Sequence, residues 1–443
     1  MNLLTFEFWP FFLILLFLYY FLSFKFQNIL LTLANVFFIA SWGSHSLITL
    51  VVSMGLSYLV YLKIIDESTD HKVKKKFTYT FIALQITLLI YCKSSLPHLP
   101  LGISYYTFTI IAFLLEVLWK RTTTRLNALE YFISISYFPI IMMGPIERLS
   151  KFSLQLRTQR VITLDSFKNG LYPIALGLFK LTAIANPLET IINHNKNPAL
   201  ETYGFGLITY CFLAFMKLYA EFSGFINVVT GLSLFLGFQI SKNFDQPYFA
   251  TSVSDIWKRW HMSLTLWLRD FVFTPLVLKT KNIALSSVIV MFLVGAWHGM
   301  IIDFFYWSLY WIIFYILYLF YMKISMTRKS AFFFQWKSVK IAVTFIITCL
   351  STLSFMIPYS GFSSLLSRLF SVSGESFFHF YNALKSMQVN LFFIISAILF
   401  MVFFESYDKN NLLKYRRIKI ILLFFLIATL GEFKLHSLLY IRT

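Results

Sequence analysis

Long apolar runs follow one another along the 443-residue chain, and neutral turns such as residues 41–46, expected outside, alternate with basic loops such as residues 63–76, expected on the cytoplasmic side. A helix needs about 20 mostly apolar residues to cross a hydrocarbon core of about 30 Å. Such runs predict helices near residues 9–24, 28–41, 46–64, 77–94 and 101–118, and again near 283–300, 303–322, 339–358, 388–405 and 418–431. Together with the middle of the chain, the pattern predicts an all-α, polytopic membrane protein of roughly 11 transmembrane helices.

The segment 128–146 departs from this regular alternation. It is apolar, but basic loops flank it on both sides, and it contains Pro139 and ends in Gly144-Pro145. A full crossing would place the basic stretch after it on the outer side, against the positive-inside rule. We therefore expect a re-entrant or broken helix, which is tolerated only where protein or a water-filled cavity covers the freed backbone groups.

The next three apolar segments raise the same conflict. Segments 170–191, 204–222 and 224–240 would place the basic stretch from Lys242 to Arg269 outside if all three crossed the membrane. We therefore expect one of the three not to cross.

Composition and charge narrow the class further. Apolar residues make up 58% of the chain and charged residues only 13%, against about 25% charged in ordinary soluble domains. The net charge of +19 would suggest nucleic acid as the partner of a soluble protein. Here the basic residues gather in the loops between apolar runs, as the positive-inside rule predicts for a membrane protein. We expect a lipid bilayer as the partner and no nucleic acid.

No feature of the sequence marks a second domain or a processed segment. There is no internal repeat, linker or composition shift, so we expect a single integral membrane domain over residues 1–443. The first run, from Trp9 to Phe24, has no basic residues before it and no small-residue cleavage site after it, which predicts a retained helix. The cysteines lie far apart in apolar runs, which indicates packing roles and neither a disulfide framework nor a metal site: Cys92, Cys211 and Cys349.

One histidine stands out among the eight. His298 is the only titratable group of the apolar run from Met291 to Met300. Ionisable groups inside a membrane are costly and usually face a cavity where they act. A buried neutral imidazole bonded to a backbone carbonyl is the alternative. The flanking Gly295 and Gly299 favour a functional role, because they let other backbone or a substrate approach the ring closely.

A second histidine belongs to a basic, tryptophan-rich stretch. His261 lies between Ser254 and Asp270, and on one continuous helix a single apolar face would carry Trp257, Trp260, Leu264 and Trp267. Such an amphipathic helix suits the membrane–water interface, so a plain surface anchor is one interpretation. The presence of His298 and the lack of a serine or cysteine nucleophile motif favour a functional one.

These residues resemble a known family. The order of Trp257–Leu264, Trp267–Asp270 and Gly295–Gly299 resembles the signature of the membrane-bound O-acyltransferase family. Further stretches in the same order resemble its bacterial polysaccharide-modifying branch: Pro100–Phe108, Gly144–Arg148, Glu221–Phe225 and Asn243–Tyr248. Two positions depart from the alginate O-acetylation type, which carries Asp where Glu221 stands and an aromatic-rich motif in place of Met356-Ile357-Pro358.

The resemblance implies many tilted helices around a central tunnel, with His298 as the base and His261 lining the tunnel towards a cytoplasmic donor. Imidazole can take a proton from an attacking hydroxyl near neutral pH. An acyl thioester, such as acetyl-CoA or an acylated carrier, would then serve as co-substrate, with no metal or cofactor. Supporting residues implied are Trp257, Arg259, Trp260, Ser263, Asp270, Trp297, Glu221, Asn227 and Asp255, although exposed charges among them are usually only solvated.

Three functions therefore stay open. The first is transfer of an acyl group, with acetyl the leading candidate, to hydroxyls of an exported cell-envelope polysaccharide in the bacterial cytoplasmic membrane, with an extracytoplasmic acyltransferase or the glycan itself as partner. The second is D-alanyl transfer from a carrier protein to teichoic acid, which would use the same two histidines. The third is a transporter or flippase, which typically shows paired repeats that this sequence lacks.

Overall fold

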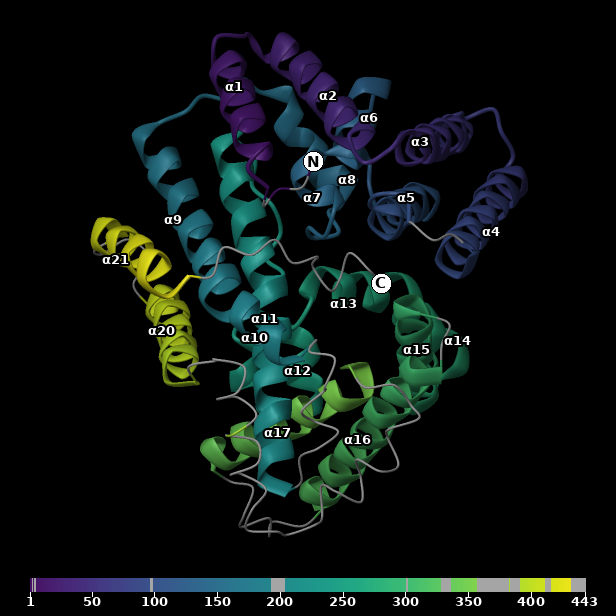
Figure 1. Ribbon diagram of the computed structural model, residues 1–443. Helices are drawn as coiled ribbons and strands as arrows, with labels where there is room; N and C mark the ends of the chain where they lie inside the picture. Colours follow the sequence, from purple (N-terminus) through teal and green to yellow (C-terminus); the bar gives the residue numbers. More distant parts are fainter. Residues whose placement is uncertain are drawn as a thin grey trace. The chain divides into compact units, whose positions relative to one another are not determined.

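The computed structural model describes residues 1, 3, 5–95, 99–192, 204–299, 302–327, 336–356, 382, 391–410 and 416–431 (Figure 1). These residues form helices joined by turns and loops, and no strand occurs among them. The predicted all-α class is confirmed for this part of the chain.

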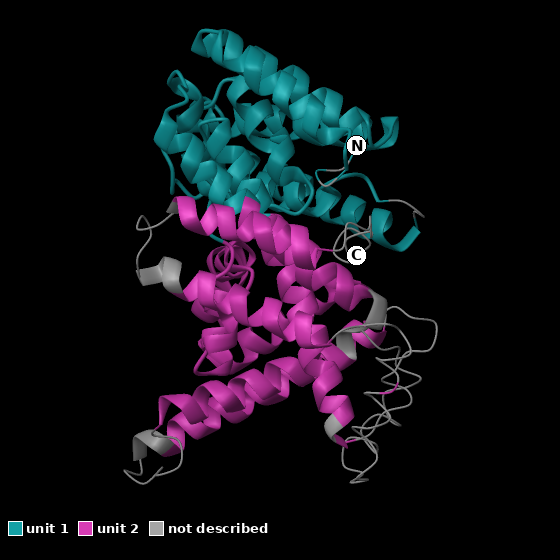
Figure 2. Cartoon of the chain, turned by 60° about the vertical axis from the view of Figure 1, so that its left-hand side comes forward, with its two compact units in different colours: residues 1–174, 226–242, 440–443 teal, residues 175–225, 243–439 magenta. Residues whose placement is uncertain are grey.

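The described residues divide into two compact units (Figure 2). The first contains residues 1–174 and 226–242, and the second contains the described parts of 175–225 and 243–439. Two helices, α9 (Leu164–Lys180) and α11 (Gly204–Phe235), continue from one unit into the other. The single domain over residues 1–443 stays a prediction.

The remaining elements fall within one unit each. The first unit contains α1 (Phe8–Tyr20), α2 (Phe24–Ala40), α3 (Ser44–Ile65), α4 (His71–Ser95), α5 (Ile103–Leu118), α6 (Ala128–Ser136), α7 (Phe138–Ile141), α8 (Leu149–Phe152) and η1 (Ser153–Arg157). The second contains η2 (Leu181–Ala185), α10 (Asn186–Ile192), η4 (Pro247–Phe249), α12 (Val253–Arg259), α13 (Met262–Leu268), η5 (Arg269–Phe273), α14 (Thr274–Thr280), α15 (Ile283–His298), α16 (Ile302–Thr327), α17 (Lys337–Met356), α20 (Leu391–Asn410) and α21 (Arg416–Leu430).

Several helices are long and apolar enough to cross a membrane. Within the described residues there are five such spans: Ser44–Ile65, His71–Ser95, Leu164–Glu189, Gly206–Phe235 and Ile302–Ile324. Shorter apolar helices add to them: Phe8–Tyr20, Phe24–Ala40, Ile103–Leu118, Ile283–His298 and Leu391–Ser406. The chain is therefore a multi-pass membrane protein, and the count of roughly 11 crossings stays a prediction.

The segment 128–146 is broken, as predicted. The helix α6 begins at a capping box formed by Asn127 and Glu130 and ends before Tyr137, whose ψ of 105° leaves the helical region. Pro139 explains the break, because it has no N–H and its ring would clash with the carbonyl of Ile135 in a continuous helix. The short α7 follows. Neither piece is long enough to cross a membrane.

A predicted break within α11 is wrong. Segments 204–222 and 224–240 were expected as separate helices, but the structure has one helix of 32 residues from Gly204 to Phe235. Gly224 serves close packing here, since a Cβ on it would lie 3.0 Å from the carbonyl oxygen of Gly177 on α9. If α9 and α11 each cross once, Lys242 lies on the same side as Arg148, which the positive-inside rule predicts to be cytoplasmic. The conflict with the positive-inside rule therefore disappears.

We expect cysteines introduced at Lys75 and Lys242 to react with an impermeant thiol reagent from the cytoplasmic side only, and one at Ser44 from the outer side only. All three positions are exposed, whereas the native cysteines are buried. The measurement is sided labelling of intact and opened cells. Labelling of Lys242 together with Ser44 would contradict two crossings between Arg148 and Lys242.

Candidate active site

The basic, tryptophan-rich stretch forms two short helices instead of the single amphipathic helix predicted for 257–267. The first, α12, ends at Arg259, and α13 begins at Met262. Between them Trp260 is extended and His261 adopts a left-handed conformation with φ of 44°. A non-glycine residue is strained there and persists only when its surroundings hold it. The prediction of one continuous helix is wrong.

Backbone hydrogen bonds explain the turn. The N–H of Asp245 donates to the carbonyl oxygen of Arg259 at 2.9 Å, and the N–H of Met262 donates to that of Asn243, also at 2.9 Å. The segment 243–245 therefore holds the turn from both sides. Without these partners the buried peptide groups around His261 would lose their hydrogen bonds, which costs free energy.

The side chain of Asn243 fixes the imidazole of His261. Its Oδ1 accepts from the N–H of Ser263 at 3.0 Å and from the hydroxyl of Ser263 at 2.8 Å, and it lies 3.3 Å from Nδ1 of His261. An atom that accepts a backbone N–H bond must be the amide oxygen, so Nδ1 of His261 donates to it. The second ring nitrogen, Nε2, therefore carries the lone pair.

Burial keeps His261 neutral. Its side chain is 3% exposed and lies edge to face with the ring of Phe222, whose centroid is 4.9 Å away. Burial lowers the pKa of His261 to about 3, because the apolar surroundings disfavour the charged form. Nε2 has no hydrogen-bond partner within the described residues. It is a buried acceptor available to a hydroxyl group.

His298 lies in an aromatic cage. It is the last residue of α15 and is 7% exposed. Ring centroids surround the imidazole at 4.6 Å for Trp297, 5.3 Å for Trp307 and 5.6 Å for Phe304. These contacts fix the plane and position of the ring.

Trp297 connects the two histidines. Its ring lies 4.6 Å from that of His298 and 6.2 Å from that of His261. The two imidazoles, 37 positions apart in sequence (298 − 261 = 37), therefore flank a single indole within one unit. The structure brings together the two residues predicted to be catalytic and one predicted supporting residue.

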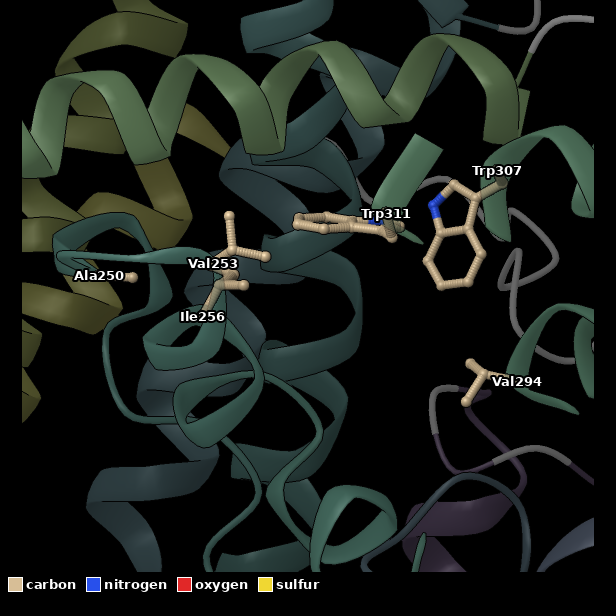
Figure 3. Packing of buried hydrophobic residues seen from close by; sticks show 6 residues of the cluster. All are labelled: Ala250, Val253, Ile256, Val294, Trp307 and Trp311. Atoms are coloured by element: carbon tan, nitrogen blue, oxygen red, sulfur yellow. The ribbon is translucent and has the colours of Figure 1, made fainter. Parts of the chain in front are cut away.

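A cluster of apolar side chains holds α12 against α15 and α16 (Figure 3). Its buried members are Ala250, Val253, Ile256, Val294, Trp307 and Trp311. Trp257, predicted to line the site, packs edge to face on Trp311 with centroids 5.1 Å apart. Because Trp307 also contacts His298, this cluster ties the helix before His261 to the cage around His298.

Other predicted supporting residues lie around this core. Arg259 pairs with Asp255, with Nε 3.1 Å from Oδ1, and its guanidinium lies 3.8 Å from a carboxylate oxygen of Asp245. Burial alone would raise the pKa of Asp255, but hydrogen bonds from the backbone of Thr251 and from Arg259 outweigh it and hold that pKa below its usual value. Trp260 packs on Phe244 at 5.2 Å.

Three predicted residues have other surroundings. Asp270 lies in a partly exposed pair with Arg269, 2.8 Å from Oδ1 to Nε, which suits a surface role. Glu221 is buried and pairs with Lys217 at 2.8 Å. Asn227 lies on the part of α11 that belongs to the other unit.

Asn243 is the residue that sequence reasoning missed as a functional side chain. It stands in a stretch already singled out by resemblance, but its contact with His261 joins residues 18 positions apart across a turn. An amide side chain directly before the apolar Phe244, within that stretch, was the available signal.

We expect Gly295→Ala to destabilise the cage. A Cβ on Gly295 would lie 1.9 Å from Oγ of Ser308 and 2.7 Å from the carbonyl oxygen of Phe304, so α15 and α16 must separate. Overpacking of this kind costs about 1–3 kcal/mol. The measurement is the melting temperature of the detergent-extracted protein. Gly55→Ala is the control, because nothing lies within 4 Å of its Cβ. Equal melting temperatures for the two variants would contradict the close packing.

The fold and the site define a class: a polytopic helical membrane protein with two buried histidines on one tryptophan. Within the described residues, no group of three His, Cys, Asp or Glu side chains could hold a metal ion. Residues 37–362 match the MBOAT, membrane-bound O-acyltransferase, family, and the chain belongs to that family.

Curated relatives share this family. The chain is 30% identical to the probable alginate O-acetylase AlgI of Pseudomonas fluorescens, over 69% of this chain and 63% of that protein. It is 26% identical to the peptidoglycan O-acetyltransferase of Helicobacter pylori, over 64% of this chain and 63% of that protein. It is 28% identical to the teichoic acid D-alanyltransferase of Bacillus subtilis, over 57% of this chain and 69% of that protein. The match thus spans less than two thirds of the length of the first two relatives.

Proposed function

We propose that this protein is an O-acyltransferase of the bacterial cytoplasmic membrane. It would transfer an acyl group, with acetyl the leading candidate, from a cytoplasmic thioester donor to hydroxyls of an exported cell-envelope polysaccharide. The observation that carries the proposal is the pair of buried histidines on Trp297, in a chain that belongs to the membrane-bound O-acyltransferase family. The names of the relatives support acyl transfer to envelope polymers.

In the proposed reaction, His298 accepts the proton of the acceptor hydroxyl as its oxygen attacks the thioester carbonyl. The tetrahedral intermediate then expels the thiolate, which takes the proton back from the imidazolium, and an ester and a free thiol result. General base catalysis of this kind typically contributes about 10²–10⁴-fold. The exchange involves no change of oxidation state, so we expect no redox cofactor, and with the imidazole as base and an activated thioester as donor we expect no metal.

His261 supports this reaction by lining and orienting. The Asn243 contact leaves Nε2 as a neutral acceptor, which can receive a hydrogen bond from a hydroxyl. The donor would be acetyl-CoA or an acylated carrier, and the acceptor would be the glycan itself or an extracytoplasmic acyltransferase that relays the group. A central tunnel between the two sides is part of the proposal.

The test is mass spectrometry of envelope glycans from cells with and without the protein, combined with proteoliposomes supplied with labelled acetyl-CoA. We expect a glycan ester that requires the protein, and release of free CoA in the vesicles when acceptor is present. Movement of a solute or lipid without thioester consumption would instead indicate a transporter or flippase and overturn the proposal.

D-alanyl transfer to teichoic acid is the second candidate. The observation that favours it is the Bacillus subtilis relative, of whose length the match spans 69%. Acetyl-CoA and a D-alanylated carrier protein, offered separately to the same proteoliposomes, distinguish the two. Turnover with the carrier alone would assign the second function.

A further inference from the structure

A carboxylate in the second unit is bound on several sides by groups from other elements. Glu405 lies on α20, and its side chain is only 11% exposed. Lys180 of α9 forms an ion pair with it, and the hydroxyl of Tyr219 lies 2.8 Å from both carboxylate oxygens. The hydroxyl of Tyr248 donates to it at 2.6 Å. Lys180 also contacts the hydroxyl of Ser223, 3.2 Å from its Nζ.

Such a cluster needs a reason to exist inside a membrane protein. Burying an ion pair costs desolvation energy, and a well-packed apolar pair of similar volume is often as stable. The cluster also lies where the regular helix is interrupted, because the π-helical η2 follows Lys180 directly. Single-turn π segments inside α-helices are frequent at functional sites. Stability alone is therefore a weak explanation.

The cluster holds the segment 243–248. Tyr248 at its end donates to Glu405, and the amide Nε2 of Gln246 donates to the hydroxyl of Ser406 at 3.0 Å. Two adjacent residues of α20 thus bind two residues of this segment. Gln246 has a φ of 50°, a left-handed conformation that persists only where the surroundings impose it. The bonds of Gln246 and Tyr248 to α20 hold this end of the segment.

The other end of the same segment holds His261. Asn243 binds the imidazole, and the backbone bonds of 243–245 hold the turn at 259–262. Tyr219 adds a second path, because its ring packs on Phe244 at 5.6 Å and on Trp260 at 6.2 Å. Side-chain hydrogen bonds and the backbone of residues 243–248 therefore connect Glu405 to the imidazole of His261. Nε2 of that imidazole has no hydrogen-bond partner within the described residues.

We propose that Glu405 is a positioning residue for acyl transfer, acting through Tyr248 and the segment 243–248 on His261. The inference rests on the proposed function, because it assigns His261 a role in the transfer. It also gives α20 a place in the site, although that helix lies beyond residues 37–362 that match the family. The C-terminal part of this chain would thus complete the candidate active site.

The test uses Tyr248→Phe in the full-length protein in proteoliposomes. This variant removes one hydroxyl and leaves the ion pair of Lys180 and Glu405 in place. We expect kcat to fall about 10- to 100-fold with KM for the thioester within about twofold, since small misplacements of a catalytic group act on the chemical step. We also expect faster modification of His261 by diethyl pyrocarbonate, followed by peptide mass spectrometry, because the ring would be less firmly held.

A matched control is Tyr131→Phe in the first unit. Tyr131 is also a fully buried phenol, and its hydroxyl donates to Oγ of Ser57 at 2.8 Å. It should leave kcat and the modification rate of His261 at wild-type values. If Tyr248→Phe also shows the wild-type kcat and the wild-type modification rate of His261, the proposal is overturned. The cluster then only holds helices together.

A second variant removes the charges together. The double substitution Lys180→Met with Glu405→Gln avoids an unpaired buried charge, which a single change would leave. We expect it to remain monodisperse and to show the same fall in kcat and the same faster modification as Tyr248→Phe. Wild-type kcat in a folded double variant would contradict a positioning role for the carboxylate.

The proposed function and this inference fail in different ways. Wild-type turnover in His261→Ala would remove the role of His261 in transfer. Faster modification of His261 in Tyr248→Phe and in the double variant would still establish that Tyr248 and Glu405 hold the ring. A fall in kcat for His261→Ala without any effect of Tyr248→Phe would leave the proposed function intact and overturn the inference.

Discussion

Replacing His298 with alanine is expected to lower acyl transfer about 10²–10⁴-fold, the usual contribution of a general base. The protein should remain inserted and monodisperse, because the substitution removes a polar group from an apolar helix end. The three aromatic rings around the imidazole belong to α15 and α16, which also pack on each other elsewhere. The measurement is acyl incorporation into the acceptor glycan, with size-exclusion chromatography of each variant.

The control is His71→Ala. His71 is exposed at the start of α4, in the other unit, and its loss should leave transfer unchanged. Full activity in His298→Ala would discard it as the base. Loss of activity together with aggregation would instead assign His298 a packing role in the aromatic cage.

Much of the helical framework could be predicted from the hydrophobic pattern. Runs of apolar residues with a basic loop at one end identify α3, α4 and α16 to within about six residues, because a membrane helix is defined by local composition. The pattern failed at Gly224, where a glycine serves the close approach of α9, and at His261, where the helix breaks. Both features depend on contacts with distant segments, which no local pattern contains.

The candidate site divides in the same way. His298 and Trp297 are neighbours in sequence, so a single motif identifies both. The contact of Trp297 with His261 and the binding of His261 by Asn243 arise only in the folded chain. The pair of Lys180 and Glu405 joins positions 225 residues apart. A lysine and a glutamate in separate apolar runs must find partners inside a membrane protein, and this rule was the available signal.

His261→Ala should lower transfer by less than His298→Ala, because we assign it to orientation. Asn243→Ala should produce a loss similar to that of His261→Ala, and combining the two should add little, since Asn243 acts through the imidazole. The measurement is initial turnover for both single variants and the double variant. Fully additive losses would contradict a shared path.

Asn243→Asp separates the geometry of this contact from its charge. A carboxylate keeps an acceptor oxygen for Nδ1 of His261 and for the N–H of Ser263, so the ring should stay in place and activity near pH 8 should exceed that of Asn243→Ala. The negative charge favours the imidazolium and raises the pKa of His261 from its value of about 3. As the pH falls through the raised pKa, a proton occupies Nε2 and removes the acceptor lone pair. Transfer by Asn243→Asp should therefore decline at mildly acidic pH. In the wild type His261 stays neutral at that pH, so protonation of His261 should cause no loss of activity. Parallel pH profiles for the two proteins would contradict a neutral His261 held by Asn243.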